Sequence, residues 1–195
     1  MEKIRISAAT LVIIKLDDKY LLALNKTRSK AGIKVFTPLG GNLKFNKSAK
    51  LFLVSLGAEF EQNNGLRLSM PKKNLSKFEQ WFKKKVQREI TPYRELKEEL
   101  VDEIKVFDKL PRHAVKFKFI QTKKERRITD RPGQKGKLTQ RYFEIFEVKL
   151  IPKYEKILRR KISKTNKLEL ITKKEIISKK SKSKIRIGTN CRALI

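Results

Sequence analysis

An acidic cluster near the middle of the chain carries the clearest chemical signal in the sequence. Six of the 20 acidic residues fall between residues 89 and 103. On an α-helix, Glu95, Glu98, Glu99 and Asp102 lie three and four positions apart, so their carboxylates share one face. Like charges at this spacing weaken the helix, and a bound cation removes that penalty. Carboxylate oxygens are ligands that Mg²⁺ and Mn²⁺ prefer, and these ions in turn bind the oxygens of a pyrophosphate.

A solvated, glutamate-rich helix face is the common alternative to a metal site. Arg94 precedes Glu98 by four positions, so its guanidinium is expected to hold a carboxylate in place. The rest of the chain is strongly basic, with 50 Lys and Arg residues and a formal net charge of +30. That charge indicates a polyanionic partner or an anionic ligand, or else a lysine-rich codon usage. A concentrated cluster of acidic residues on such a basic chain favours a metal site that is surrounded by positive charge.

Length and composition limit the class of protein. A chain of 195 residues suits a single domain, 1–195, with a real hydrophobic core. No apolar run approaches the roughly 18 residues of a membrane span, which argues against a membrane partner. The N-terminal residues lack a secretory apolar stretch, and the single cysteine, Cys191, excludes a disulfide framework and a cysteine-rich zinc site. We therefore expect a cytoplasmic protein.

The elements that position the acidic cluster are predicted from residue patterns. The acidic helix is expected to begin with Thr91 as N-cap and Pro92 at its first position, and to end near Asp102. Residues 151–167 fit either a loop or a frayed helix. Strands on both sides of a central helix predict a mixed α/β or α+β domain. The other expected elements are strands at 8–16, 20–24, 66–70, 114–122, 141–150 and 168–171, a helix containing Phe78, Trp81 and Phe82, a basic loop at 123–138, and a helix at 173–178 capped by Thr172.

Residues 94–99, Arg-Glu-Leu-Lys-Glu-Glu, resemble the core of the Nudix box, R-E-U-x-E-E, where U is aliphatic. Gly40-Gly41, after Thr-Pro-Leu, resembles the glycine pair that precedes the catalytic helix in that family. The two opening strands resemble the start of a Nudix domain. Residues 169–176 are similar to its late strand-to-helix step.

The resemblance implies a Nudix-like α/β/α sandwich with a mixed sheet. It also implies hydrolysis of a nucleoside diphosphate linked to another group. By position, Glu98 and Glu99 would be ligands of Mg²⁺ or Mn²⁺, Glu95 a ligand or a supporting carboxylate, and Arg94 the residue that orients them. The glycine pair, Gly40 and Gly41, would lie at the bound cofactor.

The sequence departs from the full box at several positions. Val86 stands where the family has Glu, Gln80 where it has Gly, and Leu100-Val101-Asp102 replaces x-Gly-aliphatic. Gly41 and Arg94 are 53 positions apart, which predicts an insertion at about 45–80 before the catalytic helix. Glu89 could take the place of the glutamate that the family has at position 86 only if the segment before the catalytic helix is rearranged. The departures leave open whether the site is catalytically competent.

The insertion and its flanks, at 66–68, 77–82 and 88–96, resemble a divergent bacterial branch of the superfamily. This branch is the Nudix-like domain associated with second-messenger nucleotidyltransferases in antiphage defence. It implies a nucleotide or nucleotide second messenger as partner. Two alternatives to a hydrolase stay open, a nucleotide-sensing or adaptor module of a defence system and a basic RNA-binding protein. The oligomeric state is open, and the basic C-terminal segment, 179–195, is expected to be partly flexible.

The remaining candidates favour structural roles. His113 is the only histidine and is expected at the surface. Cys191 has no partner and is expected to be inert. Aromatic residues at 78, 81 and 82 suit a packing face better than a base-stacking platform. Residues 123–127 suit either a solvated hairpin or a binding site for phosphates. Glu125 and Glu144 are the later acids that are candidates for an additional base.

Overall fold

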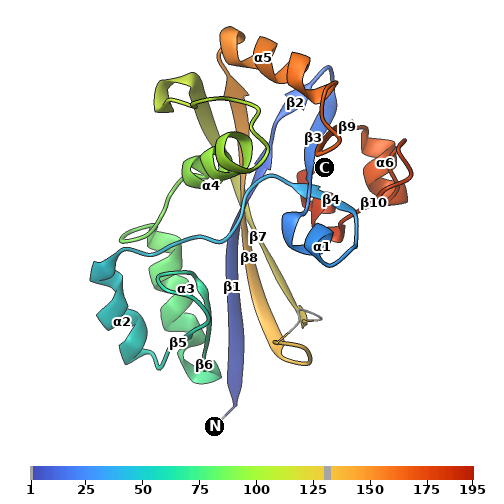
Figure 1. Ribbon diagram of the computed structural model, residues 1–195. Helices are drawn as coiled ribbons and strands as arrows, with labels where there is room; N and C mark the ends of the chain where they lie inside the picture. The colour runs from blue at the N-terminus through green and yellow to red at the C-terminus, as the bar shows by residue number, and fades with distance from the viewer. Residues whose placement is uncertain (1, 130–132) are drawn as a thin grey trace. The chain divides into compact units, whose positions relative to one another are not determined.

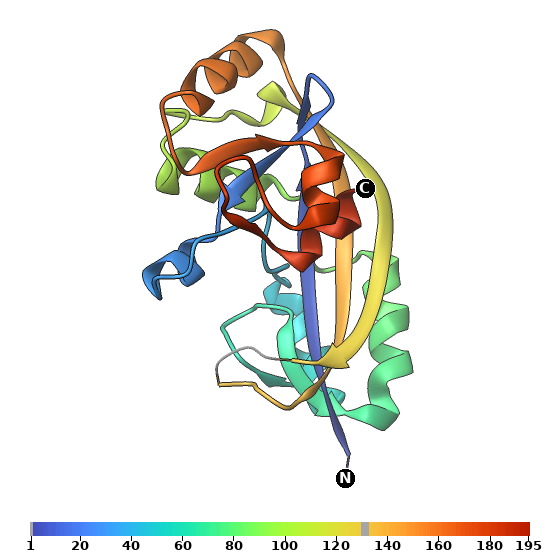
Figure 2. The same ribbon diagram turned by 90° about the vertical axis from the view of Figure 1, so that its right-hand side faces the viewer.

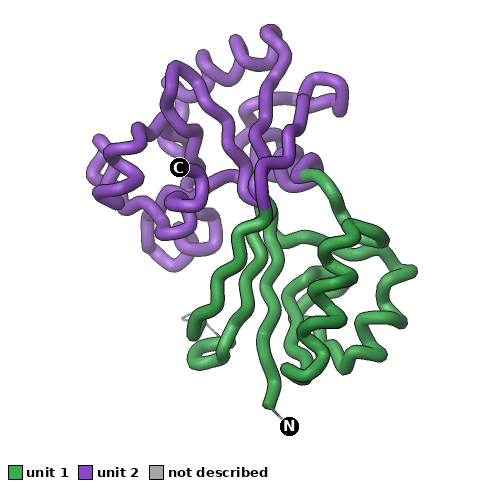
Figure 3. The backbone as a smooth tube through the Cα atoms, turned by 180° about the vertical axis from the view of Figure 1, so that it is seen from behind, with its two compact units in different colours: residues 1–10, 41–91, 122–144 green, residues 11–40, 92–121, 145–195 purple. Residues whose placement is uncertain are grey.

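The computed structural model describes residues 2–129 and 133–195, which fold as two compact units (Figures 1 and 3). Unit 1 holds residues 1–10, 41–91 and 122–144, and unit 2 holds residues 11–40, 92–121 and 145–195. The single domain expected from chain length stays a prediction, and the predicted insertion at about 45–80 falls entirely within unit 1.

The first sheet has the strand order β5-β6-β1-β8-β7. Strands β5 (Glu59–Phe60) and β6 (Arg67–Pro71) belong to unit 1, and β6 pairs antiparallel with β1 (Lys3–Ile13). The long strands β1, β7 (Val115–Ile128) and β8 (Leu138–Leu150) contribute residues to both units. Along β1 of unit 1, Ile4, Ile6 and Ala8 are buried at alternate positions, the period expected of a strand with one face on a core.

Helices α2 (Lys50–Ser55) and α3 (Leu75–Lys84) complete unit 1, each preceded by a short 3₁₀ turn, η1 (Lys47–Ala49) and η2 (Lys72–Asn74). Phe78, Trp81 and Phe82 recur at helical spacing on α3 and are almost fully buried. They pack with Tyr142 of β8, whose ring centroid lies 5.0 Å from that of Phe82. The packing-face interpretation of these aromatic residues is confirmed.

A buried ion pair lies at the end of α3 in unit 1. Both oxygens of Glu144 accept hydrogen bonds from the Arg88 guanidinium, at 2.7 and 3.1 Å, and neither side chain is more than 1% exposed. The same guanidinium donates to the carbonyls of Phe82 and Glu89. Arg88 therefore fixes the residues that follow α3, and Glu144 serves as its partner, not as the additional base considered from the sequence.

Unit 2 contains a second sheet of order β10-β4-β3-β2, with β9 also paired to β3. The pairing of β10 with β4 is parallel, and the other pairs are antiparallel, so the sheet is mixed. Its strands are β2 (Lys15–Leu16), β3 (Lys19–Leu24), β4 (Val35–Pro38), β9 (Leu168–Ile171) and β10 (Arg186–Ile187).

Unit 2 also contains several helical segments. They are α1 (Lys26–Lys30), α4 (Tyr93–Lys97), the π-helix η3 (Glu98–Glu103), the 3₁₀ turn η4 (Arg112–Ala114), α5 (Pro152–Ile162), α6 (Lys173–Ser178) and the 3₁₀ helix η5 (Thr189–Leu194). The core joins the apolar sides of α4, η3 and α5 to apolar residues of β3 and β9. Helix α6 lies beside η5 (Figure 2).

Several sequence predictions are confirmed, and a mixed α/β fold is among them. Helix α6 begins with a capping box in which the side chains of Thr172 and Glu175 each bond to the other's backbone N–H. Residues 152–162 form a helix, which resolves the choice left open for that stretch. None of the helices in the described ranges has the length and apolar character needed to cross a membrane.

Other predictions are wrong at the boundaries of elements. Strand β7 continues to Ile128, through residues assigned to a loop, because both faces of this edge strand are largely exposed and the alternating apolar signal is lost. The acidic helix begins with Pro92 as N-cap in place of Thr91, and no side chain caps it. The C-terminal segment, 179–195, contains β10 and η5, and its partial flexibility stays a prediction.

The buried ion pair of unit 1 gives a stability prediction. Replacing Arg88 by Met removes both short hydrogen bonds of the buried Glu144 and leaves Lys85, at 4.0 Å, as its charged partner, so we expect the free energy of unfolding to fall by about 3–5 kcal/mol in urea denaturation. The double variant Arg88→Met with Glu144→Leu should recover much of this loss, because no charge is then buried alone.

The exposed ion pair between Lys3 and Glu59 of the same unit is the control. The Lys3→Met variant should lose less than about 1 kcal/mol, as is usual for surface pairs. Equal losses in Arg88→Met and Lys3→Met would contradict the assignment of a structural role to the buried pair.

Candidate functional site

The acidic cluster of unit 2 lies on α4 and η3, and buried leucines fix its orientation. Leu96 and Leu100 are fully buried in the core, which turns the opposite side of the helix toward solvent. The Tyr93 hydroxyl donates to the carbonyl of Leu110 at 2.7 Å and holds the start of α4. The apolar pattern thus decides which side chains face outward.

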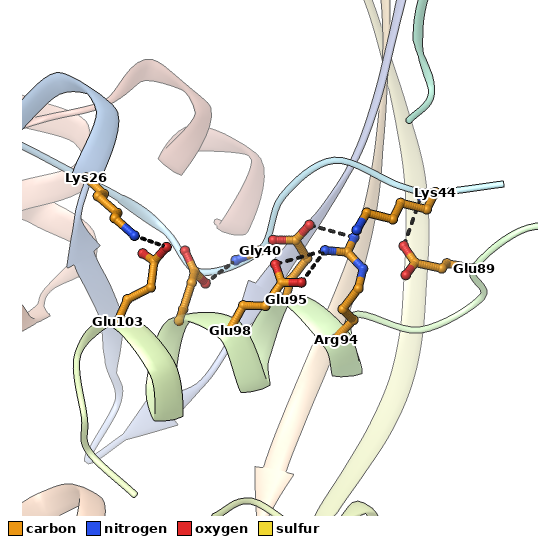
Figure 4. Close-up of polar contacts among 9 residues, drawn as sticks. Lys26, Gly40, Lys44, Glu89, Arg94, Glu95, Glu98 and Glu103 are labelled. Carbon is orange, nitrogen blue, oxygen red and sulfur yellow. Dashed lines mark hydrogen bonds and ion pairs between the residues drawn. The ribbon is translucent and has the colours of Figure 1, made fainter. Parts of the chain in front are cut away.

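Four carboxylates line one pocket of about 210 Å³ in unit 2 (Figure 4). Glu95, Glu98, Glu99 and Glu103 come from the helix, and all but Glu99 are labelled in Figure 4. The other residues that contribute to the lining are Ala23, Leu24, Asn25, Lys26, Thr27, Thr37, Gly40 and Ile104. Glu95, Glu98, Glu99 and Gly40, four of the residues predicted from the sequence, therefore lie together.

Glu99 is held against the loop that follows β4. The backbone N–H of Gly40 donates to Oε2 of Glu99 at 2.7 Å. Gly40 has a φ of 115°, a conformation that residues with a side chain rarely adopt, so glycine is needed to present this N–H. Burial raises the pKa of Glu99 to about 8, and the neighbouring carboxylates Glu95, Glu103 and Glu98 add to the rise, whereas the Gly40 bond opposes it.

Basic residues bind the other three carboxylates. Arg94 contacts Glu95 at 2.7 Å and donates to both oxygens of Glu98, at 2.9 and 3.1 Å (Figure 4). Lys26 donates to Glu103 at 2.6 Å. Arg94 thus contacts two of the glutamates that the resemblance implies it orients. Lys26 belongs to α1, on the other side of the pocket.

The winding of η3 changes which acidic residues share the pocket. In a π-helix the backbone bonds run from residue i to i+5, as in the 2.9 Å bond between the Ile104 N–H and the Glu99 carbonyl. The wider turn places Glu103 in line with Glu98 and Glu99. The α-helical spacing predicted Asp102 on the acidic face, and this prediction is wrong, since Asp102 is exposed and does not line the pocket.

The donor chemistry of the pocket suits a hard divalent cation, because all four acidic groups offer oxygen ligands. The raised pKa of Glu99 also reflects crowded negative charge that a cation would stabilise. As the side chains lie, however, no three acidic, histidine or cysteine groups of the described residues are spaced to hold a metal ion. Metal binding would require carboxylates to leave Arg94 and Lys26.

Other sequence-predicted residues lie in unit 1. The carbonyl of Gly41 accepts from the N–H of Thr10, and Glu89 pairs with the backbone of Lys44, whose N–H donates to its carboxylate at 2.9 Å (Figure 4). Val86, in the position of the expected glutamate, is 48% exposed. Glu125 contacts Arg127 and Arg141 and does not line the pocket.

The single histidine and the single cysteine have the roles expected of them. His113 is exposed, which confirms its surface position. Cys191 is fully buried, its thiol contacts the carbonyl of Phe36, and burial raises its pKa to about 12. A thiol with so high a pKa is almost entirely protonated at neutral pH, so the inert-thiol interpretation is supported.

Sequence reasoning missed the residues that face the helix across the pocket. Asn25 follows β3 and caps α1, because its side chain accepts a hydrogen bond from the N–H of Arg28 at 3.0 Å. The cap places Lys26 at the first position of α1 and beside the pocket. The Asn-Lys-Thr run after an apolar strand carried a capping signal, but nothing local linked it to a helix 70 residues later.

Comparison with known proteins identifies the family. No curated protein and no solved structure matches the chain. The family pattern described as the SMODS-associated NUDIX domain matches residues 3–195, which is almost the whole chain. The chain therefore belongs to the SMODS-associated NUDIX domain family.

Proposed function

We propose that the protein is a metal-dependent Nudix-type hydrolase that cleaves a pyrophosphate bond in a nucleoside diphosphate-linked or related nucleotide, in the setting of antiphage defence. One observation carries the proposal. Glu95, Glu98, Glu99 and Glu103 meet at one pocket of a chain whose formal net charge is +30. Carboxylates crowded against their mutual repulsion are typical of a site built for a cation.

In this proposal Glu95, Glu98 and Glu99 hold Mg²⁺ or Mn²⁺, and Glu103 supports them. Bound there, the ion would polarise the pyrophosphate and activate a water molecule. In the ion-free site Arg94 holds Glu95 and Glu98 side by side, and it yields their oxygens to the ion. The Gly40 N–H keeps Glu99 in place, and Lys26 moves from Glu103 to a phosphate oxygen of the nucleotide.

A nucleotide-sensing or adaptor module is the second candidate, and one feature of the pocket favours it. Its carboxylates already have partners within the chain, Arg94, Lys26 and the Gly40 N–H. A nucleotide second messenger or related nucleotide would then bind without being cleaved. The exposed Val86, where the family has Glu, is consistent with this alternative.

A panel of nucleotides with Mg²⁺ or Mn²⁺ tests the proposed activity, with products separated by chromatography. The Glu98→Gln and Glu99→Gln variants should each lose at least about 100-fold in rate, because a metal ligand supplies several kcal/mol of transition-state stabilisation. Asp102→Asn is the matched control on the same helix and should keep near-normal activity, since Asp102 does not line the pocket.

Absence of turnover by the wild-type protein across the panel would overturn the hydrolase proposal. A nucleotide that raises the melting temperature without product formation would then select the sensing alternative. A loss in Asp102→Asn as large as in Glu99→Gln would instead contradict the π-helical arrangement of the pocket.

The raised pKa of Glu99 predicts a change of stability with pH. An unfolded chain loses the Glu99 proton near pH 4.5, whereas the folded protein keeps it until about pH 8. Between these values the folded state binds more protons, so this group lowers the free energy of unfolding as pH rises. The Glu99→Gln variant should therefore match wild type at pH 4 and be more stable at pH 9, by on the order of 2–4 kcal/mol.

Chemical denaturation at the two pH values measures this difference. Added Mg²⁺ at pH 9 should stabilise wild type more than Glu99→Gln, because the variant keeps only Glu95 and Glu98 of the three proposed carboxylate ligands. If Glu99→Gln and wild type have the same dependence on pH, the raised pKa is wrong.

A further inference from the structure

A second pocket of unit 2, of about 220 Å³, has a strongly basic lining. The residues that line it are Ile104, Lys105, Val106, Lys161, Lys164 and Thr165. Three of the six are lysines, and none is acidic. This volume is several times the roughly 30 Å³ that one water molecule occupies in the liquid. It is smaller than the pockets of about 300 Å³ or more that bind drug-sized ligands. A phosphate group matches this size and charge.

The backbone brings the three lysines together from two helix ends. Lys105 follows η3 with a φ of 60°, and the next N–H, that of Val106, bonds back to the carbonyl of Leu100 at 2.8 Å. This arrangement ends the helix. It places Lys105 just after the last turn of η3, where Lys105 lines the basic pocket. Lys161 is in the last turn of α5, and the Lys164 N–H donates to its carbonyl at 3.0 Å.

Stabilisation of the α5 terminus alone does not account for the lysines. Basic side chains at the C-terminal end of a helix offset a partial charge of about −0.5. Lys105, Lys161 and Lys164 together carry three positive charges, and Lys105 follows a different helix, η3. Within residues 2–129 and 133–195, none of the three ammonium groups forms an ion pair with a carboxylate. Most of this positive charge is therefore available to an anion.

The basic pocket adjoins the acidic pocket. Ile104 lines both, with Glu103 of the acidic pocket before it and Lys105 of the basic pocket after it. Residues two positions apart have Cα atoms within about 7 Å of each other. A chain of linked phosphates, one at the carboxylates and the next at the lysines, could therefore bind both pockets at once.

We propose that Lys105, Lys161 and Lys164 form a phosphate-binding subsite, and that the ligand of this unit is a short oligonucleotide that places successive phosphates in the acidic and basic pockets. The lysines bind the phosphate oxygens, and the Thr165 hydroxyl, which accepts from the Lys167 N–H at 3.2 Å, keeps its proton free to donate. The nature of this ligand rests on the proposed nucleotide function, whereas the phosphate subsite is tested separately.

The first experiment uses inorganic phosphate alone. Backbone amide resonances are followed by NMR while phosphate replaces chloride at constant ionic strength. Wild type should show saturable shifts at residues 104–106 and 161–165, and Lys161→Gln with Lys164→Gln should lose them. Lys153→Gln with Lys156→Gln is the matched control, because it removes the same charge from exposed positions of α5 that do not line the pocket. Absent shifts in wild type, or equal losses in both double variants, would overturn the subsite.

The second experiment compares ADP with a 5′-phosphorylated adenine trinucleotide in the presence of Mg²⁺. In Lys161→Gln with Lys164→Gln, trinucleotide binding should weaken roughly three- to tenfold and ADP binding less than about twofold, since two surface charge contacts are lost only from the longer ligand. Equal effects on both ligands would overturn the oligonucleotide assignment and leave the proposed hydrolysis standing. If phosphate shifts the amide resonances but neither nucleotide binds, the proposed function is rejected and the subsite is an anion-binding site only.

Discussion

Repulsion among carboxylates is the constraint on which the acidic pocket of unit 2 depends. Charges held a few ångströms apart at the protein surface repel by several kcal/mol, so four ionised glutamates would not stay together unaided. Arg94 and Lys26 offset three of them, and Glu99 stays protonated at neutral pH because its pKa is about 8. The pocket then carries three negative and two positive charges. Its net charge is small, and a divalent cation would compete with Arg94 and Lys26 for the same oxygens.

The π-helix explains how the glutamates converge. Such segments are rare and are often found at functional sites, because their geometry is less favourable than that of an α-helix. Here the cost is offset by apolar packing, since Leu96 and Leu100 are fully buried and Val106 bonds back to the Leu100 carbonyl. The same wide turn brings Glu103 to the pocket and carries the chain to Lys105. One local feature of the backbone therefore shapes both pockets.

Sequence patterns predict those elements whose signals are local. The Thr172–Glu175 capping box defines α6, and the spacing of apolar residues defines α3 and the inner side of α4. The winding of η3 was not predictable in this way, because α- and π-helices have the same residue preferences at such short lengths and tertiary packing selects between them. Asp102 was therefore assigned to the wrong side. Lys26 was missed for a related reason, since it reaches the pocket through contacts between distant segments.

The net charge of +30 is easier to interpret once the basic side chains with acidic partners are separated from those without. Some basic side chains of the described residues are paired, as Arg159 is with Asp17 and Glu155, although 50 basic residues far exceed the 20 acidic ones. Such pairs contribute little to a directed field, because opposite charges a few ångströms apart cancel beyond about 10 Å at moderate ionic strength. The lysines of the basic pocket lack such partners, and they adjoin the carboxylates rather than lying at random over the surface. An acidic pocket next to a basic pocket is the complement of a metal-bound chain of phosphates, which neither charge feature would indicate alone.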